Sequence, residues 1–448
     1  MEYAKTVATE YGLVRGIVKD GCYQYLGIPY ATPPVGDLAF KHPIPPEPWK
    51  GILDTVRGSI NPVQGRGSST ISFDGRDCLY MNVIIPQDIE PDAPVMVWIY
   101  GGSYANGGIG RVAEDSDELS YDMARFARET HTVCVNFNYR LNLEGFLNLH
   151  YLDKKFDQNN GLFDQILALK FIRNNIHRFG GNADNITVFG QSAGAACILV
   201  LMSEPETSKL FDKAIIQSAC VDSFWTEKES HRITRTYLKY LGVKHNELDK
   251  LKDIDINLVH EANTKLRALI LREGKSTCCF SPIIDGVTIK DWPGKTSKVF
   301  SGPILIGTTL QEGDLFVMKI PNILLIPTAF LFKFKMRIGK GSHRKIADDF
   351  TERYYRTPAR KIARDIKGDS WVYEYRYLTP DMIKRNTGCC HACEIPILFG
   401  KSNAAYNIDD PVSQRVGEKL RELWSEFAYK GTLPWKMHKL EGTVKDLE

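Results

Sequence analysis

The stretch that decides the fold is Val188-Phe189-Gly190-Gln191-Ser192-Ala193-Gly194. The apolar run 186–189 predicts a short buried strand, and the run 193–202 predicts a helix. Between them stands a Gly-x-Ser-x-Gly pattern, whose glycines permit a sharp turn from strand into helix. Such a turn strains Ser192 and holds its hydroxyl out at the end of a sheet. The amide of Ala193 would then point at the group that this hydroxyl attacks.

Strands and helices alternate along most of the chain. The runs 95–100 and 132–137 are mostly apolar throughout, as in strands of a sheet that is covered on both faces. The other expected elements are a hairpin over 13–28, helices over 160–181 and 413–429, and strands over 79–85, 213–217, 304–307 and 371–377. This alternation predicts an α/β fold with a mostly parallel, twisted central sheet flanked by helices. Since no repeat or low-complexity linker interrupts it, we expect one domain over 1–448.

The composition is that of a soluble globular protein. Hydrophobic residues make up 43% and charged residues 25% of the chain. A net charge of +3 is too small for a dedicated nucleic-acid binder. No run approaches the ~20 apolar residues of a membrane span, and the N-terminus shows no secretory pattern. We therefore expect a cytoplasmic protein with no nucleic-acid partner, and we leave its oligomeric state open.

The ten cysteines predict free thiols rather than disulfides. Several lie in apolar runs, where cysteine behaves as a small hydrophobic residue, and a chain of this length does not need disulfides to build a core. A reducing cytoplasm is the matching compartment. The cluster Cys389-Cys390-His391-Ala392-Cys393 has no second ligand pair at zinc-finger spacing. We therefore expect neither a metal nor a cofactor.

The segment 321–345 mixes leucine, isoleucine and phenylalanine with lysine and arginine. One interpretation is an interfacial helix on a membrane surface. The interpretation that we favour is a lid whose apolar face covers a pocket and whose basic face is solvated. The insertion that would carry such a lid covers about 315–365.

A serine hydroxyl becomes a nucleophile only with partners. It needs a base, a carboxylate that orients the base, and donors for the oxyanion. In α/β-hydrolases the acid and then the histidine follow the serine along the chain, and a Gly-rich loop near the start supplies oxyanion donors. Here Glu312 and His391 follow Ser192 in that order, and Gly101-Gly102-Ser103 ends an early strand.

Several longer stretches resemble the type-B carboxylesterase/cholinesterase family of α/β-hydrolases, and specifically its intracellular bacterial, para-nitrobenzyl-esterase-like branch. They are 27–31, 33–36, 77–83, 138–140, 160–165, 179–182 and 217–218. The resemblance covers most of the chain and implies an α/β-hydrolase fold with a reduced helical lid. It implies Ser192 as nucleophile, His391 as general base and Glu312 as the orienting acid.

The same resemblance implies roles for further residues. The amides of Gly102, Ser103 and Ala193 would form the oxyanion hole. Ser218 and Glu394 would lie behind the triad. Arg140 and Asp164 would pair in a structural salt bridge.

The chain also departs from the family pattern. Secreted relatives close a disulfide on the cysteine that matches Cys78, and the preceding segment here offers no partner cysteine. Ala39 and Arg76 stand where the family commonly has an ion pair, and Gln191 where many relatives have glutamate. The loop 64–77 contains no tryptophan, so the aromatic choline platform of cholinesterases is absent.

The expected activity is hydrolysis of small neutral or aromatic carboxylic esters through an acyl-enzyme on Ser192. Alternatives on the same triad are a lipase, a thioesterase or an amidase. An alternative of another class is a non-catalytic adhesion or scaffold protein, although such relatives typically lose the nucleophile. Phe224 and Trp225 are candidates for an acyl-pocket wall, with core packing as the alternative.

Overall fold

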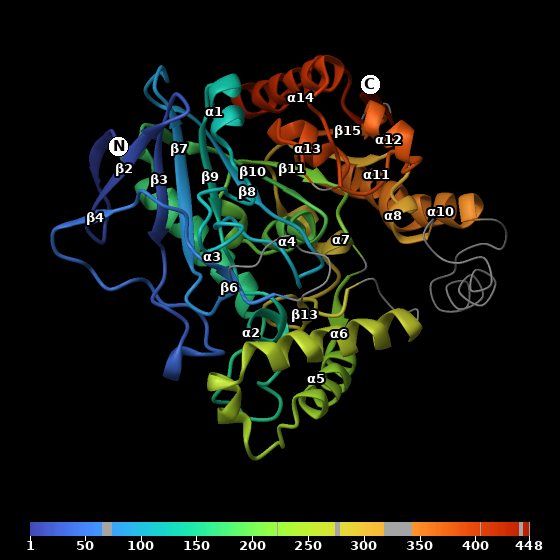
Figure 1. The fold of residues 1–448 in the computed structure, drawn as a ribbon. Helices are drawn as coiled ribbons and strands as arrows, with labels where there is room; N and C mark the ends of the chain where they lie inside the picture. The colour runs from blue at the N-terminus through green and yellow to red at the C-terminus, as the bar shows by residue number, and fades with distance from the viewer. Residues whose placement is uncertain are drawn as a thin grey trace.

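The structure is a computed structural model, and it describes residues 1–64, 74–221, 223–273, 278–317, 343–403, 405–438 and 442–447. Within these residues, one large sheet runs through the centre of the molecule in the order β1-β2-β3-β7-β9-β8-β10-β11-β14-β15-β16, with β4 paired to β2 (Figure 1). Its strands are β1 (Tyr3–Ala8), β2 (Leu13–Lys19), β3 (Cys22–Pro29), β4 (Ile52–Asp54), β7 (Tyr80–Pro86), β8 (Ala93–Ile99), β9 (Val133–Phe137), β10 (Gly181–Gln191), β11 (Lys213–Gln217), β14 (Ile304–Thr309), β15 (Ser370–Tyr375) and β16 (Lys445–Leu447). Two small sheets pair β5 (Asn61–Pro62) with β6 (Asp74–Gly75) and β12 (Trp225–Thr226) with β13 (Ile283–Ile284).

The sheet changes character along its width. The path from β1 through β2, β3 and β7 to β9 is antiparallel. From β9 through β8, β10, β11, β14 and β15 to β16, every pairing is parallel. The α/β fold with a mostly parallel central sheet is therefore confirmed.

Helices cover both faces of the sheet (Figure 1). Helices α1, α13 and α14 pack together on one face, and α3, α4 and α11 lie on the other. The α-helices are α1 (Ala124–Thr130), α2 (Asn142–Phe146), α3 (Asn160–Asn175), α4 (Ala193–Leu201), α5 (Glu227–Leu241), α6 (Ile256–Glu273), α7 (Pro293–Thr296), α8 (Asp314–Val317), α10 (His343–Thr351), α11 (Thr357–Asp365), α12 (Pro380–Arg385), α13 (Glu394–Phe399) and α14 (Pro411–Lys430). Between α10 and α11 stands one π-helical turn, η6 (Glu352–Arg356).

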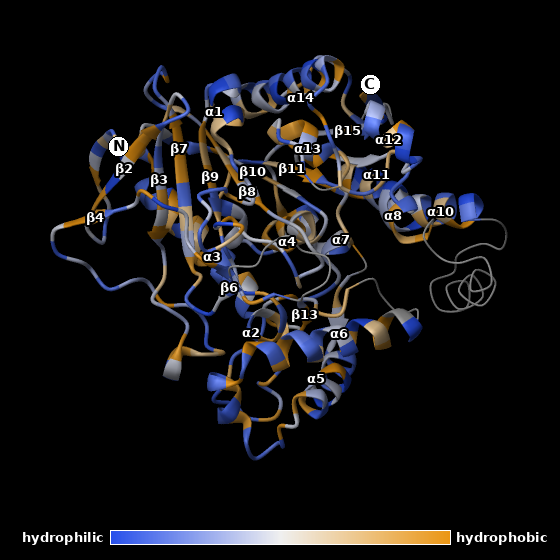
Figure 2. Cartoon of the chain, viewed as in Figure 1, coloured by the Kyte–Doolittle hydropathy of each residue, from blue (hydrophilic) through white to orange (hydrophobic). Residues whose placement is uncertain are grey.

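The local sequence explains why the centre is buried. All seven residues of β8, Ala93-Pro94-Val95-Met96-Val97-Trp98-Ile99, are buried, because helices cover both of its faces. Helix α4 is buried at every position and carries no charged side chain. Figure 2 shows this contrast: apolar residues follow the inner strands, while α5 and α14 expose hydrophilic faces. The core therefore holds strand β10 and helix α4 on either side of Ser192.

A buried ion pair fixes the segment that follows β9. Arg140 and Asp164 form two side-chain hydrogen bonds, of 2.7 and 2.9 Å, and the Arg140 backbone N–H donates to the same carboxylate. Both side chains are almost completely buried. The salt bridge that the resemblance implied is therefore confirmed. Arg76, which stands at one of the two positions of the family's usual ion pair, pairs here with Glu144 at 2.9 Å.

The remaining sequence-based expectations have mixed outcomes. All ten cysteines are free, as expected. Among the described residues, no helix combines the length and the apolar character that crossing a membrane requires. Most of the segment 321–345 lies outside the described residues, so the lid and the interfacial helix both stay predictions there. The described flanks of that insertion are helical, from α8 before it to α10, η6 and α11 after it.

The buried ion pair generates a stability prediction. Replacing Asp164 by asparagine leaves the Arg140 guanidinium buried without a counter-charge, so the free energy of unfolding should fall by about 3–5 kcal/mol. Urea unfolding followed by circular dichroism measures this change. The matched control is Asp117→Asn, because Asp117 pairs with Arg57 at an exposed site, and its loss should cost less than about 1 kcal/mol. Equal losses in the two variants would contradict the prediction.

Candidate active site

Ser192 lies at the sharp turn between β10 and α4. Its backbone has φ 57° and ψ −121°, a strained combination for a residue with a side chain. Both flanking glycines stand against the backbone of β8. A Cβ on Gly190 would lie 2.6 Å from the carbonyl oxygen of Ile99, and one on Gly194 would lie 2.1 Å from the same oxygen. Since no larger residue fits at either place, both glycines are required for the sharp turn that the sequence predicted around Ser192.

The Ser192 hydroxyl begins a short chain of hydrogen bonds. Its Oγ lies 2.8 Å from Nε2 of His391, and Nδ1 of that ring lies 2.6 Å from Oε2 of Glu312. All three side chains are buried. A carboxylate beside Nδ1 favours the ring tautomer that leaves Nε2 able to accept the serine proton. The fold thus brings together three residues that the sequence separates widely.

Glu312 is held from two further sides. The Ser218 hydroxyl donates to Oε1 of Glu312 at 2.5 Å, and the Thr309 backbone N–H donates to the same oxygen at 2.7 Å. Both bonds leave Oε2 free for the histidine. The resemblance predicted that Ser218 lies behind the triad, and the structure places it there. Thr309 was missed, because a backbone donor gives no side-chain signal in a sequence.

Gln311 ties the segment that bears Glu312 to the segment that bears His391. The backbone N–H of Gln311 donates to the carbonyl oxygen of Cys389 at 2.9 Å. In return, the backbone N–H of Cys389 donates to Oε1 of Gln311 at 2.8 Å. This two-point brace fixes the segment that bears Glu312 relative to the segment that bears His391. Sequence analysis missed Gln311, whose only signal is its place directly before the acid.

The expected oxyanion loop follows β8 and lies against Ser192. A Cβ on Gly101 would lie 2.9 Å from the Cβ of Ser192. Gly102 has φ 114°, and a Cβ there would lie 2.1 Å from a carbonyl oxygen of the turn that follows. Ser103 has φ 57°, in the left-handed region that favours glycine. Ala193 is the first residue of α4, directly after Ser192.

Glu394 lies behind the triad in the first turn of α13. Its Oε1 accepts a hydrogen bond from the side-chain amide of Gln217 at 3.3 Å, and its Oε2 has no partner within the described residues. Burial, and then the nearby charge of Glu312, raises the pKa of Glu394 to about 7. The position behind the triad is the one that the resemblance predicted.

Gln191 and Cys220 complete the surroundings of the reactive pair. Nε2 of Gln191 lies 3.1 Å from Nε2 of His391, and Sγ of Cys220 lies 3.4 Å from Oγ of Ser192. The Gln191 amide is neutral, where many relatives place a glutamate. Burial raises the pKa of the Cys220 thiol to about 12, so this thiol stays protonated near neutral pH. Sequence analysis did not single out Cys220, although it lies two residues after Ser218.

The aromatic residues around the site differ from those expected. Phe224 packs edge-on against Trp292, with ring centroids 6.3 Å apart, and both Phe224 and Trp225 belong to the main hydrophobic core. Core packing therefore describes them. The rings against His391 come instead from the insertion: Tyr355 lies 5.1 Å and Phe316 lies 5.5 Å from the imidazole, between ring centroids.

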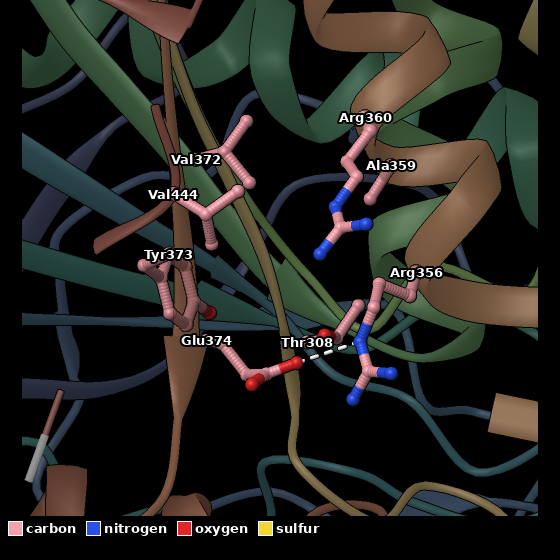
Figure 3. A pocket seen from close by; sticks show the side chains of 8 residues that line it. All are labelled: Thr308, Arg356, Ala359, Arg360, Val372, Tyr373, Glu374 and Val444. Carbon is pink, nitrogen blue, oxygen red and sulfur yellow. Dashed lines mark ion pairs between the residues drawn. The ribbon is translucent and has the colours of Figure 1, made fainter. Parts of the chain in front are cut away.

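A small pocket lies outside the triad, between α11 and strands β14 and β15 (Figure 3). Figure 3 shows Arg356 and Glu374 joined across it by an ion pair, at 2.6 Å. Its lining residues are Thr308, Arg356, Ala359, Arg360, Val372, Tyr373, Glu374 and Val444. None of them belongs to the triad. The ion pair joins the turn η6, which contains Arg356, to strand β15, which contains Glu374. Within the described ranges, no group of three or more histidine, cysteine, aspartate or glutamate side chains could hold a metal ion.

Ser192 lies on a strained strand-to-helix turn of a mostly parallel sheet, hydrogen-bonded to His391, which is hydrogen-bonded to Glu312. Glu312 and His391 follow the serine in the chain. This combination defines a serine hydrolase with the α/β-hydrolase fold. The comparisons with known proteins give the family. The model of the carboxylesterase family matches residues 3–340, and the chain belongs to this family. It is therefore a carboxylic ester hydrolase.

Individual relatives agree with that assignment. The chain is 34% identical to para-nitrobenzyl esterase of Bacillus subtilis over 95% of this chain and 90% of that protein. It is 30% identical to acetylcholinesterase of Bungarus fasciatus, over 95% of this chain and 78% of that protein. A solved para-nitrobenzyl esterase structure matches with a TM-score of 0.84 and 30% identity, over 99% of this chain and 96% of that one. The resemblance to the para-nitrobenzyl-esterase-like branch is thus confirmed.

The raised pKa of Glu394 generates a prediction about stability and pH. Between its ordinary value of 4.5 and about 7, the folded protein holds a proton on Glu394 that the unfolded chain has released. The free energy of unfolding should therefore fall across this window as the pH rises, by an amount on the order of 3 kcal/mol. The Glu394→Gln variant should lack this fall.

Urea unfolding of both proteins, at intervals between about pH 4.5 and pH 8, measures the difference. The control is Glu422→Gln, at an exposed position of α14, which should keep the slope of the unchanged protein. Identical slopes for the unchanged protein and Glu394→Gln would rule out the role of Glu394.

Proposed function

We propose that this carboxylesterase hydrolyses small neutral or aromatic esters through an acyl-enzyme on Ser192. The observation that carries the proposal is the hydrogen-bonded chain from Ser192 through His391 to Glu312. In this mechanism Nε2 of His391 accepts the serine proton while Oγ attacks the ester carbonyl. The alcohol leaves with that proton. Water, activated by the same imidazole, then hydrolyses the acyl group from Ser192.

The developing oxyanion would be stabilised by the backbone amides of Gly102, Ser103 and Ala193. Support for this assignment is their position on the two segments that meet at Ser192, one after β8 and one at the start of α4. Each such donor is typically worth about 3 kcal/mol of the barrier. The amides are fixed by the backbone, so they need no reorganisation during the reaction.

A cytoplasmic location fits this proposal. All ten cysteines are free, and Cys220 lies beside the nucleophile as a thiol. Free thiols are the usual state of cysteines in a reducing compartment. The ester substrate would then be an intracellular small molecule.

Replacement of Ser192 by alanine tests the proposal. The change removes the attacking atom, so kcat on p-nitrophenyl acetate should fall by at least about 10⁴-fold. Ser203→Ala is the matched control, because that buried hydroxyl donates to the carbonyl oxygen of Leu199 and accepts from the Thr296 hydroxyl, away from Ser192 and His391. Its activity should stay within about twofold. Undiminished turnover by Ser192→Ala would refute the assignment.

Turnover of different substrates by the unchanged protein distinguishes between the possible substrate classes. Faster turnover of the acetyl ester than of an octanoyl ester, a thioester or an anilide would support a small-ester carboxylesterase. A clear preference for one of the other three would instead identify a lipase, a thioesterase or an amidase on the same triad.

A further inference from the structure

One hydroxyl near the nucleophile has only a weak partner. Tyr355 is buried, and its Oη lies 3.4 Å from Sγ of Cys220. A thiol is a poor hydrogen-bond acceptor. By contrast, the buried hydroxyls of Tyr30, Tyr139 and Tyr237 donate to oxygens at 2.5 to 2.8 Å. Buried phenol groups normally find such a partner, so the Tyr355 hydroxyl could exchange its weak contact with the thiol for a bond to a stronger acceptor.

This hydroxyl is one thiol away from the reacting atom. Cys220 Sγ contacts Oγ of Ser192 on one side and Oη of Tyr355 on the other, both at 3.4 Å. The Tyr355 ring also lies against His391. The hydroxyls of Tyr104 and Tyr375 also lack a partner in the described part of the chain. Of these three tyrosines, only Tyr355 has both a hydrogen bond to Cys220 and a ring contact with His391 in the described part of the chain.

The backbone at Tyr355 has a rare conformation. It lies in the π-turn η6, and π-helical turns are rare and often stand at functional sites. The next residue anchors the turn: Arg356 pairs with Glu374 on β15 at 2.6 Å (Figure 3). Arg356 also donates to the carbonyl oxygen of Leu310 at 3.1 Å. The Tyr355 ring is therefore held in place next to His391 rather than left free to turn outward.

The surroundings of this ring come from the insertion. Tyr355 packs with Val317, Ile346 and Phe350 in a small hydrophobic cluster of which Cys220 is also a member. The cluster joins α8, α10 and η6 to the segment after β11. Its apolar side chains surround two polar atoms, the phenol oxygen and the thiol sulfur. Ligand-binding sites commonly combine such apolar surroundings with a small number of fixed polar groups.

We propose that Tyr355 is a specificity-determining residue. Its hydroxyl donates a hydrogen bond to an ether or hydroxyl oxygen that the acyl chain carries on the carbon next to the scissile carbonyl. The proposal rests on the proposed esterase function. The substrate class that it names is esters of alkoxy or hydroxy carboxylic acids. Cys220 is the spacer that sets the distance between this donor and Ser192, and its protonated thiol takes no part in the attack.

The test compares two esters of the same shape, p-nitrophenyl methoxyacetate and p-nitrophenyl butyrate, which differ by one ether oxygen in place of a methylene group. For Tyr355→Phe, kcat/KM on the methoxyacetate should fall about five- to tenfold, the value of one ordinary hydrogen bond. The rate on the butyrate should stay within about twofold. Because each ester is compared between the two proteins, its intrinsic reactivity cancels.

Two further variants sharpen the result. Tyr151→Phe, which removes a hydroxyl bonded to the carbonyl oxygen of His231, should leave both rates unchanged. Cys220→Ala should keep the preference for the methoxyacetate, because the phenol donor remains. Loss of the preference in Cys220→Ala would assign the selectivity to the thiol and overturn the proposal.

Equal losses on both esters in Tyr355→Phe would also overturn it, since the hydroxyl would then act through His391 or the fold. No loss on either ester would show that the hydroxyl does not meet the substrate. If the unchanged protein hydrolysed neither ester, the proposed function itself would fail. If the unchanged protein hydrolysed both esters and Tyr355→Phe did so with the same ratio of rates, only this inference would be refuted.

Discussion

The parallel register of neighbouring strands is the constraint on which the site depends. The carboxyl ends of β8, β10, β11 and β14 meet at one edge of the sheet, and each is followed by a segment that contributes to the site. The hydrogen-bond ladder continues past the strands: Ser192 N–H donates to the Gln217 carbonyl oxygen at 2.9 Å, and Ser218 N–H donates to that of Gly307 at 2.8 Å. A one-residue slip between these strands would therefore displace Ser192 and also Ser218, which donates to Glu312.

His391, the proposed base, is the one member of the proposed triad that the inner strands do not position directly. His391 lies in a loop before α13, and its place is set by the Gln311 brace, by the Glu312 carboxylate and by the rings of Phe316 and Tyr355. The rings come from the insertion near 315–365. The described flanks of the predicted lid segment thus pack against His391. The same arrangement places the Tyr355 phenol against the imidazole of His391 and within hydrogen-bond distance of Cys220, which in turn contacts Ser192.

Much of the fold and of the site was predictable from local sequence. Strands β8 and β10 were recognisable because strands covered on both faces are continuous apolar runs. Ser192, Glu312 and His391 were recognisable because serine hydrolysis needs those residue types and the α/β-hydrolase fold places them in that order. Helices α5 and α6 were not predicted, although the Thr226 and Glu229 capping box at the start of α5 is a readable signal. The contact between Cys220 and Tyr355 joins residues 135 positions apart, and a single sequence carries no trace of such a long-range contact.

The central claim is that Ser192 carries the acyl group during turnover. Its most direct test is rapid quenching in acid during hydrolysis of a p-nitrophenyl ester, followed by mass spectrometry of the protein and its peptides. The account predicts one acyl group per chain, located on the peptide that contains Gly190 to Gly194, and its disappearance in Ser192→Ala. An acyl group on Cys220, or full turnover with no acylated protein, would contradict it.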